Sequence, residues 1–176
     1  RRVRIHTLIG QRKEAPFGER AREIAAELAL HFERGRDSRR AVWYRQQAGE
    51  NALRCSAPQE AVAHLTKGLE LLQTWPEGPQ RTQQELVFQT ALGAALALTQ
   101  GYGAADVEHA YARALQLCQR LKSAVQLFPV LWGLWVFYNA RGELQTARGL
   151  AEQLFQAAQG EQSPRLLAQA HYARGV

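Results

Sequence analysis

The stretch that decides the fold is Glu60-Ala61-Val62-Ala63-His64-Leu65, a helical segment that opens on alanine after a short polar turn. The helix predicted before it contains Trp43 and carries a small residue, Gly49, near its middle. The same arrangement returns twice, ending in the segments 109–115 and 146–150. Small residues at fixed places in paired helices let neighbouring helices pack closely, as in an α-solenoid. We therefore expect an all-α solenoid of antiparallel helical hairpins with about eight helices.

The composition also favours helices. The 176 residues are 46% hydrophobic, and Leu, Ala, Gln, Glu and Arg dominate without alternating β-branched runs. The longest apolar run, residues 128–138, is about half of the roughly 18 to 20 residues that a membrane span needs. The Arg-rich start has no apolar stretch behind it, so no signal peptide is predicted. We expect a cytoplasmic chain that makes no membrane contact.

Turn signals place the helices, and the clearest break is Trp75-Pro76-Glu77-Gly78-Pro79. In the turn at residues 35–38, Gly35 is expected to end one helix and Asp37 or Ser38 to cap the next. The helices are predicted at residues 4–13, 19–34, 39–55, 58–73, 80–99, 104–121, 125–141, 144–159 and 164–174.

The positive charge is concentrated in the first third of the chain. Residues 1–54 hold 13 Lys and Arg against seven Asp and Glu, whereas the remainder is balanced at nine against nine. Such a segment could attract phosphates or an acidic partner. It could equally be a solvated surface, or a surface that meets a preceding domain. Glutamates lie among the arginines and no aromatic residues alternate with them, which makes nucleic acid the less favoured partner.

The two cysteines and the absence of methionine bear on the context of the chain. Cys55 and Cys118 lie in different predicted helices, so we expect two free thiols in a reducing compartment. The sequence starts at Arg1 and contains no methionine. We therefore expect it to be a fragment of a longer protein, cut inside a repeat at its C-terminal end.

From residue 39 onward the hairpins resemble tetratricopeptide repeats, which are helix pairs of about 34 residues with small residues at three fixed positions. Gly49, Ala61 and Gly68 match those positions in the first hairpin, whereas Arg45 departs from the pattern. The second hairpin needs about five extra residues around Gly101-Tyr102-Gly103 to stay in frame. In the third, Trp135 stands where a small residue is usual. The resemblance implies a right-handed solenoid of degenerate repeats.

A narrower resemblance concerns residues 46–52, 60–72 and 126–135 taken together. They are similar to the helical region that follows the ATPase module in large bacterial signalling proteins. Those proteins join a class III nucleotidyl cyclase or a kinase to a STAND-type ATPase. Residues 1–36, with Ala26-Glu27-Leu28-Ala29-Leu30-His31-Phe32, resemble the helical end of that ATPase module. The resemblance implies two parts, residues 1–36 and the repeats at 37–176, and a sensor or scaffold role in signal transduction.

The sequence lacks the patterns that support catalysis. There is no Gly-x-x-x-x-Gly-Lys-Ser/Thr loop to hold phosphates, and no histidine lies near either cysteine in sequence. Glu27 and His31 share a helix face at i, i+4, but a metal site needs at least a third ligand and none is evident. We expect no enzyme activity, no cofactor and no metal.

The run Trp132-Gly133-Leu134-Trp135-Val136-Phe137-Tyr138 is apolar on every helix face, which normally indicates burial between neighbours. The alternative is that one of its faces lines a concave groove, where solenoids bind peptides. In the repeat frame, Leu131, Leu134, Trp135 and Tyr138 would pack inside. The residues predicted to line the groove are Trp43, Gln46, Glu50, Val87, Thr90, Ala94, Trp132, Val136 and Asn139.

These patterns favour protein–protein interaction as the function, with a partner protein, a peptide or a neighbouring domain of the same chain on the concave face. One alternative is self-association, in which the exposed end of the repeats stacks with a second copy. A less favoured alternative is nucleic-acid contact through the basic first third.

Overall fold

In the computed structural model, residues 2–175 are described, and every regular element among them is helical. This confirms the all-α prediction, with nine α-helices in that range and one 3₁₀ segment. The elements are α1 (Arg2–Phe17), η1 (Gly18–Ile24), α2 (Ala25–Arg34), α3 (Ser38–Arg54), α4 (Pro58–Leu72), α5 (Pro79–Gln100), α6 (Ala105–Leu121), α7 (Ala124–Ala140), α8 (Leu144–Glu161) and α9 (Pro164–Gly175). No helix in this part of the chain is both long and apolar enough to cross a membrane.

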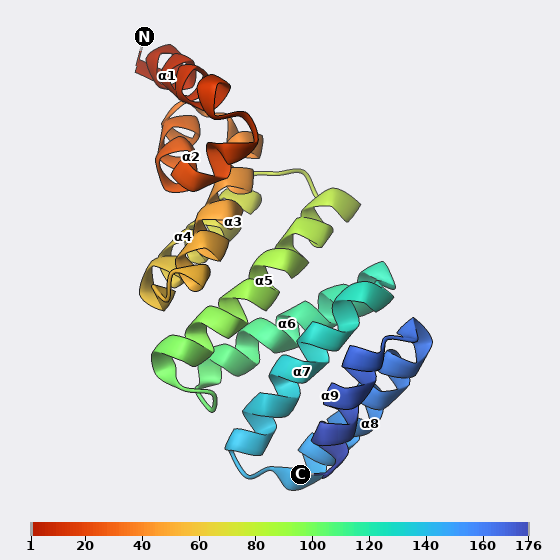
Figure 1. The fold of residues 1–176 in the computed structure, drawn as a ribbon. Helices are drawn as coiled ribbons and strands as arrows, with labels where there is room; N and C mark the ends of the chain where they lie inside the picture. The colour runs from red at the N-terminus through yellow and green to blue at the C-terminus, as the bar shows by residue number, and fades with distance from the viewer. Residues whose placement is uncertain (1, 176) are drawn as a thin grey trace.

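Each helix packs against the next along the chain, and the hairpins stack so that the two ends of the chain lie far apart (Figure 1). The first helices of successive hairpins also touch, α3 with α5 and α5 with α7. Tyr172 of α9 extends this row because its ring lies 6.5 Å from that of Trp132 on α7. The alternation of helices is that of a helical-repeat solenoid.

The start of the chain differs from the prediction. Instead of ending near residue 13, α1 continues to Phe17 and includes Pro16 in its last turn. The predicted helix at 19–34 starts as the 3₁₀ segment η1 and becomes α-helical only at Ala25. Gly18 has a φ of +49°, which turns the chain between α1 and η1.

The turns after α2, α3, α6 and α7 follow one pattern, and in three of these four the residue involved is not glycine. A residue with positive φ follows the helix, and the next backbone N–H donates to a carbonyl five residues earlier, as in a Schellman motif. After α2 this residue is Arg36, with a φ of 57°, whereas Gly35 has an ordinary φ of −79°. Gly35 ends α2 as expected, at the C-cap position, and Arg36 is the left-handed residue of the turn. Asp37 does cap α3, accepting a hydrogen bond from the N–H of Arg40 at 3.1 Å.

Position 35 requires glycine because α1 approaches it closely. A Cβ atom at this position would lie 2.6 Å from Oγ1 of Thr7. The hydroxyl of Thr7 donates to the carbonyl of Gly35 at 3.2 Å, so the contact also satisfies a carbonyl at the end of α2.

Glycines inside the helices form notches that receive large side chains from the neighbouring helix. A Cβ on Gly49 of α3 would lie 2.8 Å from the Leu65 side chain of α4. A Cβ on Gly68 of α4 would lie 2.1 Å from the ring of Phe88 on α5, so this notch joins one hairpin to the next. Leu65 and Phe88 are both fully buried. The small positions of the repeat pattern thus set the distance between helices.

Tyr111 of α6 occupies two notches at once. A Cβ on Gly93 of α5 would lie 2.7 Å from its ring, and a Cβ on Gly133 of α7 would lie 2.2 Å from it. The repeat pattern expects a small residue of α7 at the position of Trp135. The small residue that contacts α6 is instead Gly133, two positions earlier. Trp135 itself is only 4% exposed.

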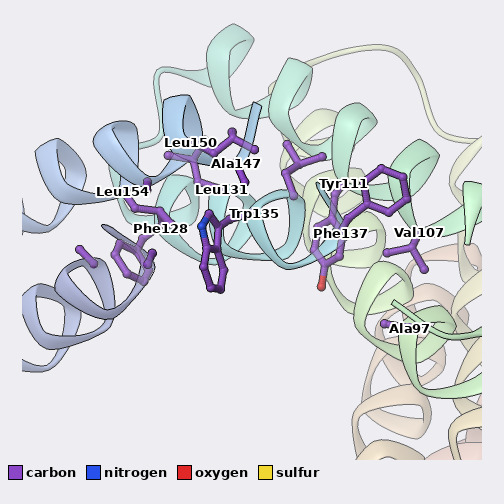
Figure 2. Packing of buried hydrophobic residues seen from close by; sticks show 14 of the residues in the cluster. Ala97, Val107, Tyr111, Phe128, Leu131, Trp135, Phe137, Ala147, Leu150 and Leu154 are labelled. Carbon is purple, nitrogen blue, oxygen red and sulfur yellow. The ribbon is translucent and has the colours of Figure 1, made fainter. Parts of the chain in front are cut away.

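The largest apolar cluster lies in the second half of the chain. Figure 2 shows Trp135 and Leu131 of α7 close to Leu150 and Leu154 of α8, with Tyr111 farther along the same cluster. Burial of Leu131, Leu134 and Trp135 agrees with the repeat frame. Tyr138 differs, since it is half-buried and its hydroxyl donates to Glu108 at 2.7 Å. Both cysteines are free, Cys55 exposed and Cys118 buried, and burial raises the pKa of the Cys118 thiol.

A polar network joins residues 1–36 to the first hairpin. Arg45 of α3 donates to Glu33 of α2 at 2.7 Å and to Nδ1 of His64 of α4 at 3.0 Å. The Arg45 side chain is only 13% exposed, which explains why this position departs from the apolar repeat pattern. A guanidinium can only donate, so Nδ1 of His64 must accept and the imidazole is neutral. Burial and the charge of Arg45 lower the pKa of His64, against the opposing charge of Glu60.

This network predicts that acid destabilises the fold. Unfolded His64 takes up a proton near its ordinary pKa of 6.5, while the folded imidazole resists protonation because its pKa is lowered. The unfolded state then binds more protons, so the free energy of unfolding should fall as the pH drops below about 6.5. Burial lowers the pKa of His31 too, which adds to the effect.

Urea unfolding at a series of pH values between 7.5 and 5 measures this dependence. His64→Gln should flatten it, whereas His109→Gln, at an exposed position on α6, should leave it as in the wild type. A pH dependence that is the same with and without His64 would contradict the assignment.

Candidate functional site

Three of the residues predicted for the groove come together around one cavity. Ala94 of α5 and Trp132 and Val136 of α7 line a space of about 290 Å³ where these two helices and α6 meet. The lining is almost entirely apolar. It consists of Ala94, Ala97, Leu98, Tyr102, Val107, Tyr111, Trp132, Gly133 and Val136.

Trp132 is held in place by aromatic neighbours. Its ring lies 5.1 Å from that of Trp135 and 6.5 Å from that of Phe128, both buried residues of α7. Tyr172 of α9 contacts it from the next helix of the row. The burial expected of the apolar run holds for Trp135, whereas Trp132 is half-buried and lines the cavity.

Tyr111 brings a polar group to the cavity wall. The residue is only 8% exposed, and burial raises the pKa of its phenol to about 12, so the hydroxyl stays protonated at neutral pH. Among the described residues, the Tyr111 hydroxyl makes no hydrogen bond. It is therefore a free donor and acceptor in a mostly apolar lining, to which Tyr102 brings a second hydroxyl.

Gln46 and Glu50 do not line this cavity, and their side chains are hydrogen-bonded to each other. The amide of Gln46 donates to Glu50 at 2.7 Å, and its carbonyl oxygen accepts from Gln84 of α5. These side chains bridge α3 and α5. This polar bridge lies between α3 and α5, at positions that the repeat frame predicts to line an open groove.

The other predicted residues are more dispersed. Val87 and Thr90 are half-buried on α5, and the Thr90 hydroxyl donates to the Leu86 carbonyl of its own helix at 2.9 Å. Asn139 is half-buried near the end of α7 and is not among the residues that line the cavity. Trp43 is 48% exposed and lines a second, larger cavity near α1.

Tyr102 and Leu98 line the cavity but were not among the predicted groove residues. Tyr102 belongs to the loop of extra residues between α5 and α6, where Gly101 takes a φ of +94°. The departure from repeat length was a visible signal in the sequence. Leu98 is 58% exposed and lies one helical turn after Ala94, so the spacing along α5 would also have found it.

The Glu27 and His31 pair is part of a contact between α1 and α2. His31 Nδ1 lies 3.2 Å from His6 Nδ1, and Glu27 forms an ion pair with Lys13. Within residues 2–175, no group of three or more His, Cys, Asp and Glu residues is placed to hold a metal ion.

Comparison with protein-family models, with curated proteins and with solved structures gave no match to this chain. The interpretation of the cavity therefore rests on its own geometry.

Proposed function

We propose that this chain is a protein–protein interaction segment that binds a peptide of a partner on the face formed by α5 and α7. One apolar side chain of the peptide would insert into the cavity beside Trp132. The observation that carries this proposal is the cavity itself, which is lined by adjacent hairpins at the positions where solenoids bind their ligands.

The chemistry of the cavity suits a side chain better than a cofactor. At about 290 Å³ it is at the lower limit of small-molecule pockets, which span roughly 300 to 1,000 Å³. The lining offers apolar contact and the hydroxyls of Tyr111 and Tyr102, and it holds no charged group among the described residues. A buried aromatic anchor such as Trp132 is typical of the residues that dominate binding energy in interfaces.

The wider role is proposed on the sequence resemblance. We infer a cytoplasmic sensor or scaffold segment of a bacterial signalling ATPase, which carries no catalytic activity of its own. Reading the open reading frame on both sides tests this part, because the proposal requires a phosphate-binding loop motif upstream.

Leu98 offers a test of the cavity that leaves the core intact. It is 58% exposed and lines the cavity, and Leu144 of α8 is also 58% exposed but lies outside it. Peptides selected from a displayed random library against the wild type should share one large apolar residue. Leu98→Gln should weaken the binding of such a peptide about tenfold, since it removes apolar contact worth about 1 to 2 kcal/mol.

Fluorescence polarisation with a labelled selected peptide gives the dissociation constants. Leu144→Gln is the matched control and should bind like the wild type. Selected peptides without a common apolar residue, or equal affinity for both variants, would contradict the proposal.

A further inference from the structure

A cavity larger than the one beside Trp132 lies at the N-terminal end of the solenoid, and residues of α1, η1 and α3 line it. Its volume is about 870 Å³, within the range of roughly 300 to 1,000 Å³ typical of small-molecule sites. The chain packs here as one unit, because η1, α2 and α3 share an apolar cluster that includes Ala21, Phe32 and Tyr44. The walls of the cavity are therefore preformed.

The cavity has a surplus of positive charge. Among the described residues, three arginines and one carboxylate line it. The arginines are Arg22, Arg39 and Arg40, and the carboxylate is that of Glu14. Arg40 forms ion pairs with Glu14 at 3.2 Å and with Asp37 at 3.7 Å. Arg39 forms no hydrogen bond or ion pair with the residues described. An exposed guanidinium without a partner beside a cavity is available for an anion.

An aromatic surface stands next to this guanidinium. Trp43 follows Arg39 by four residues on α3, so both lie on the same helix face, and Gln47 continues that face by one more turn. The indole is 48% exposed. It rests edge-to-face on Tyr44, with ring centroids 4.6 Å apart.

Tyr44 fixes the position of this wall. It is 2% exposed, its ring stacks on Phe32 at 5.6 Å, and its hydroxyl donates to Glu14 at 2.6 Å. The support beneath Trp43 is therefore tied to both α1 and α2. A ligand would meet an indole that is already held at the cavity edge.

We propose that this cavity binds a free nucleotide, with the base stacked on Trp43 and the phosphates held by Arg39. Every nucleobase has a π-face that stacks on an aromatic side chain, and a guanidinium matches the geometry of phosphate oxygens. The amide nitrogen of Gln47 donates to Glu50 at 3.4 Å, which leaves its carbonyl oxygen and second N–H for the edge of the base. A single aromatic platform favours one nucleotide over a strand, since proteins that bind single strands offer several stacking surfaces in succession.

Calorimetric titration at fixed ionic strength tests the proposal with ATP, adenosine and inorganic triphosphate as probes. ATP should bind with a stoichiometry of one, and adenosine and triphosphate should each bind at least about tenfold more weakly, since each makes only part of the contacts. Trp43→Ala should weaken ATP binding about tenfold or more, and Arg39→Gln should weaken it by a similar factor. Both side chains are exposed enough to be replaced without loss of the fold, which circular dichroism would verify.

Two control variants separate the site from general effects. Arg165→Gln removes an exposed positive charge on α9, and Leu98→Gln alters the peptide cavity; neither should change ATP binding. Absence of heat up to millimolar ATP, unchanged affinity in Trp43→Ala, or triphosphate binding as tight as ATP would overturn the proposal. Tighter binding of oligodeoxyadenylates with increasing length would overturn it too, in favour of a nucleic-acid strand.

Discussion

Replacing Tyr111 by alanine is expected to lower the free energy of unfolding by about 3 to 5 kcal/mol. The ring of Tyr111 fills the notches at Gly93 and Gly133, so its removal leaves unfilled space on two helix interfaces at once. Because one side of the ring already borders the open cavity, the lower end of that range is the better expectation. Urea unfolding followed by circular dichroism measures the change.

Tyr111→Phe is the matched control, since it keeps the ring and removes only a hydroxyl that makes no hydrogen bond to the described residues. It should change stability by less than about 0.5 kcal/mol. In a solenoid the hairpins can unfold separately, so the alanine variant should also broaden the transition. A loss below about 1 kcal/mol in Tyr111→Ala would mean that the glycine notches do not hold the second and third hairpins together.

Replacing Arg45 by methionine is expected to cost about 3 kcal/mol, because it leaves the carboxylate of Glu33 and Nδ1 of His64 without their shared donor. Methionine retains much of the side-chain length, so the loss reflects the removed charge more than a cavity. The variant should also weaken the pH dependence attributed to His64 without abolishing it, since burial is the larger cause of the lowered pKa and the charge of Arg45 the smaller one.

Lys67→Met is the matched comparison. Lys67 also faces Glu33, at 3.6 Å, but its side chain is 40% exposed, and exposed ion pairs contribute at most about 1 kcal/mol. Urea unfolding of both variants at pH 7.5 distinguishes the two contributions. Equal losses for Arg45→Met and Lys67→Met would show that burial adds nothing to the Arg45 contacts.

The candidate site was predictable where it depends on helical spacing. Ala94, Trp132 and Val136 were placed on one face by the repeat frame, and the structure brings them around one cavity. The same frame placed Gln46 on that face, but its contact with Gln84 bridges α3 and α5. Whether a groove position is open depends on which side chains meet across two helices, and spacing along one helix carries no such information.

The sequence by itself determined the helices, their hairpin order and the small residues inside them, because these follow from contacts between residues three or four apart and from the chemistry of turns. For two residues the reason lies in a distant contact that spacing along the chain does not show. Gly35 is small because Thr7 of α1 approaches it, and Arg45 is polar because Glu33 and His64 surround it. Only the tertiary structure decided that Tyr111 fills two notches, that Tyr102 and Trp132 line one cavity, and that Glu14 of α1 lines another with Trp43 of α3. Those arrangements join side chains from different helices, and only the packing of the helices brings them together.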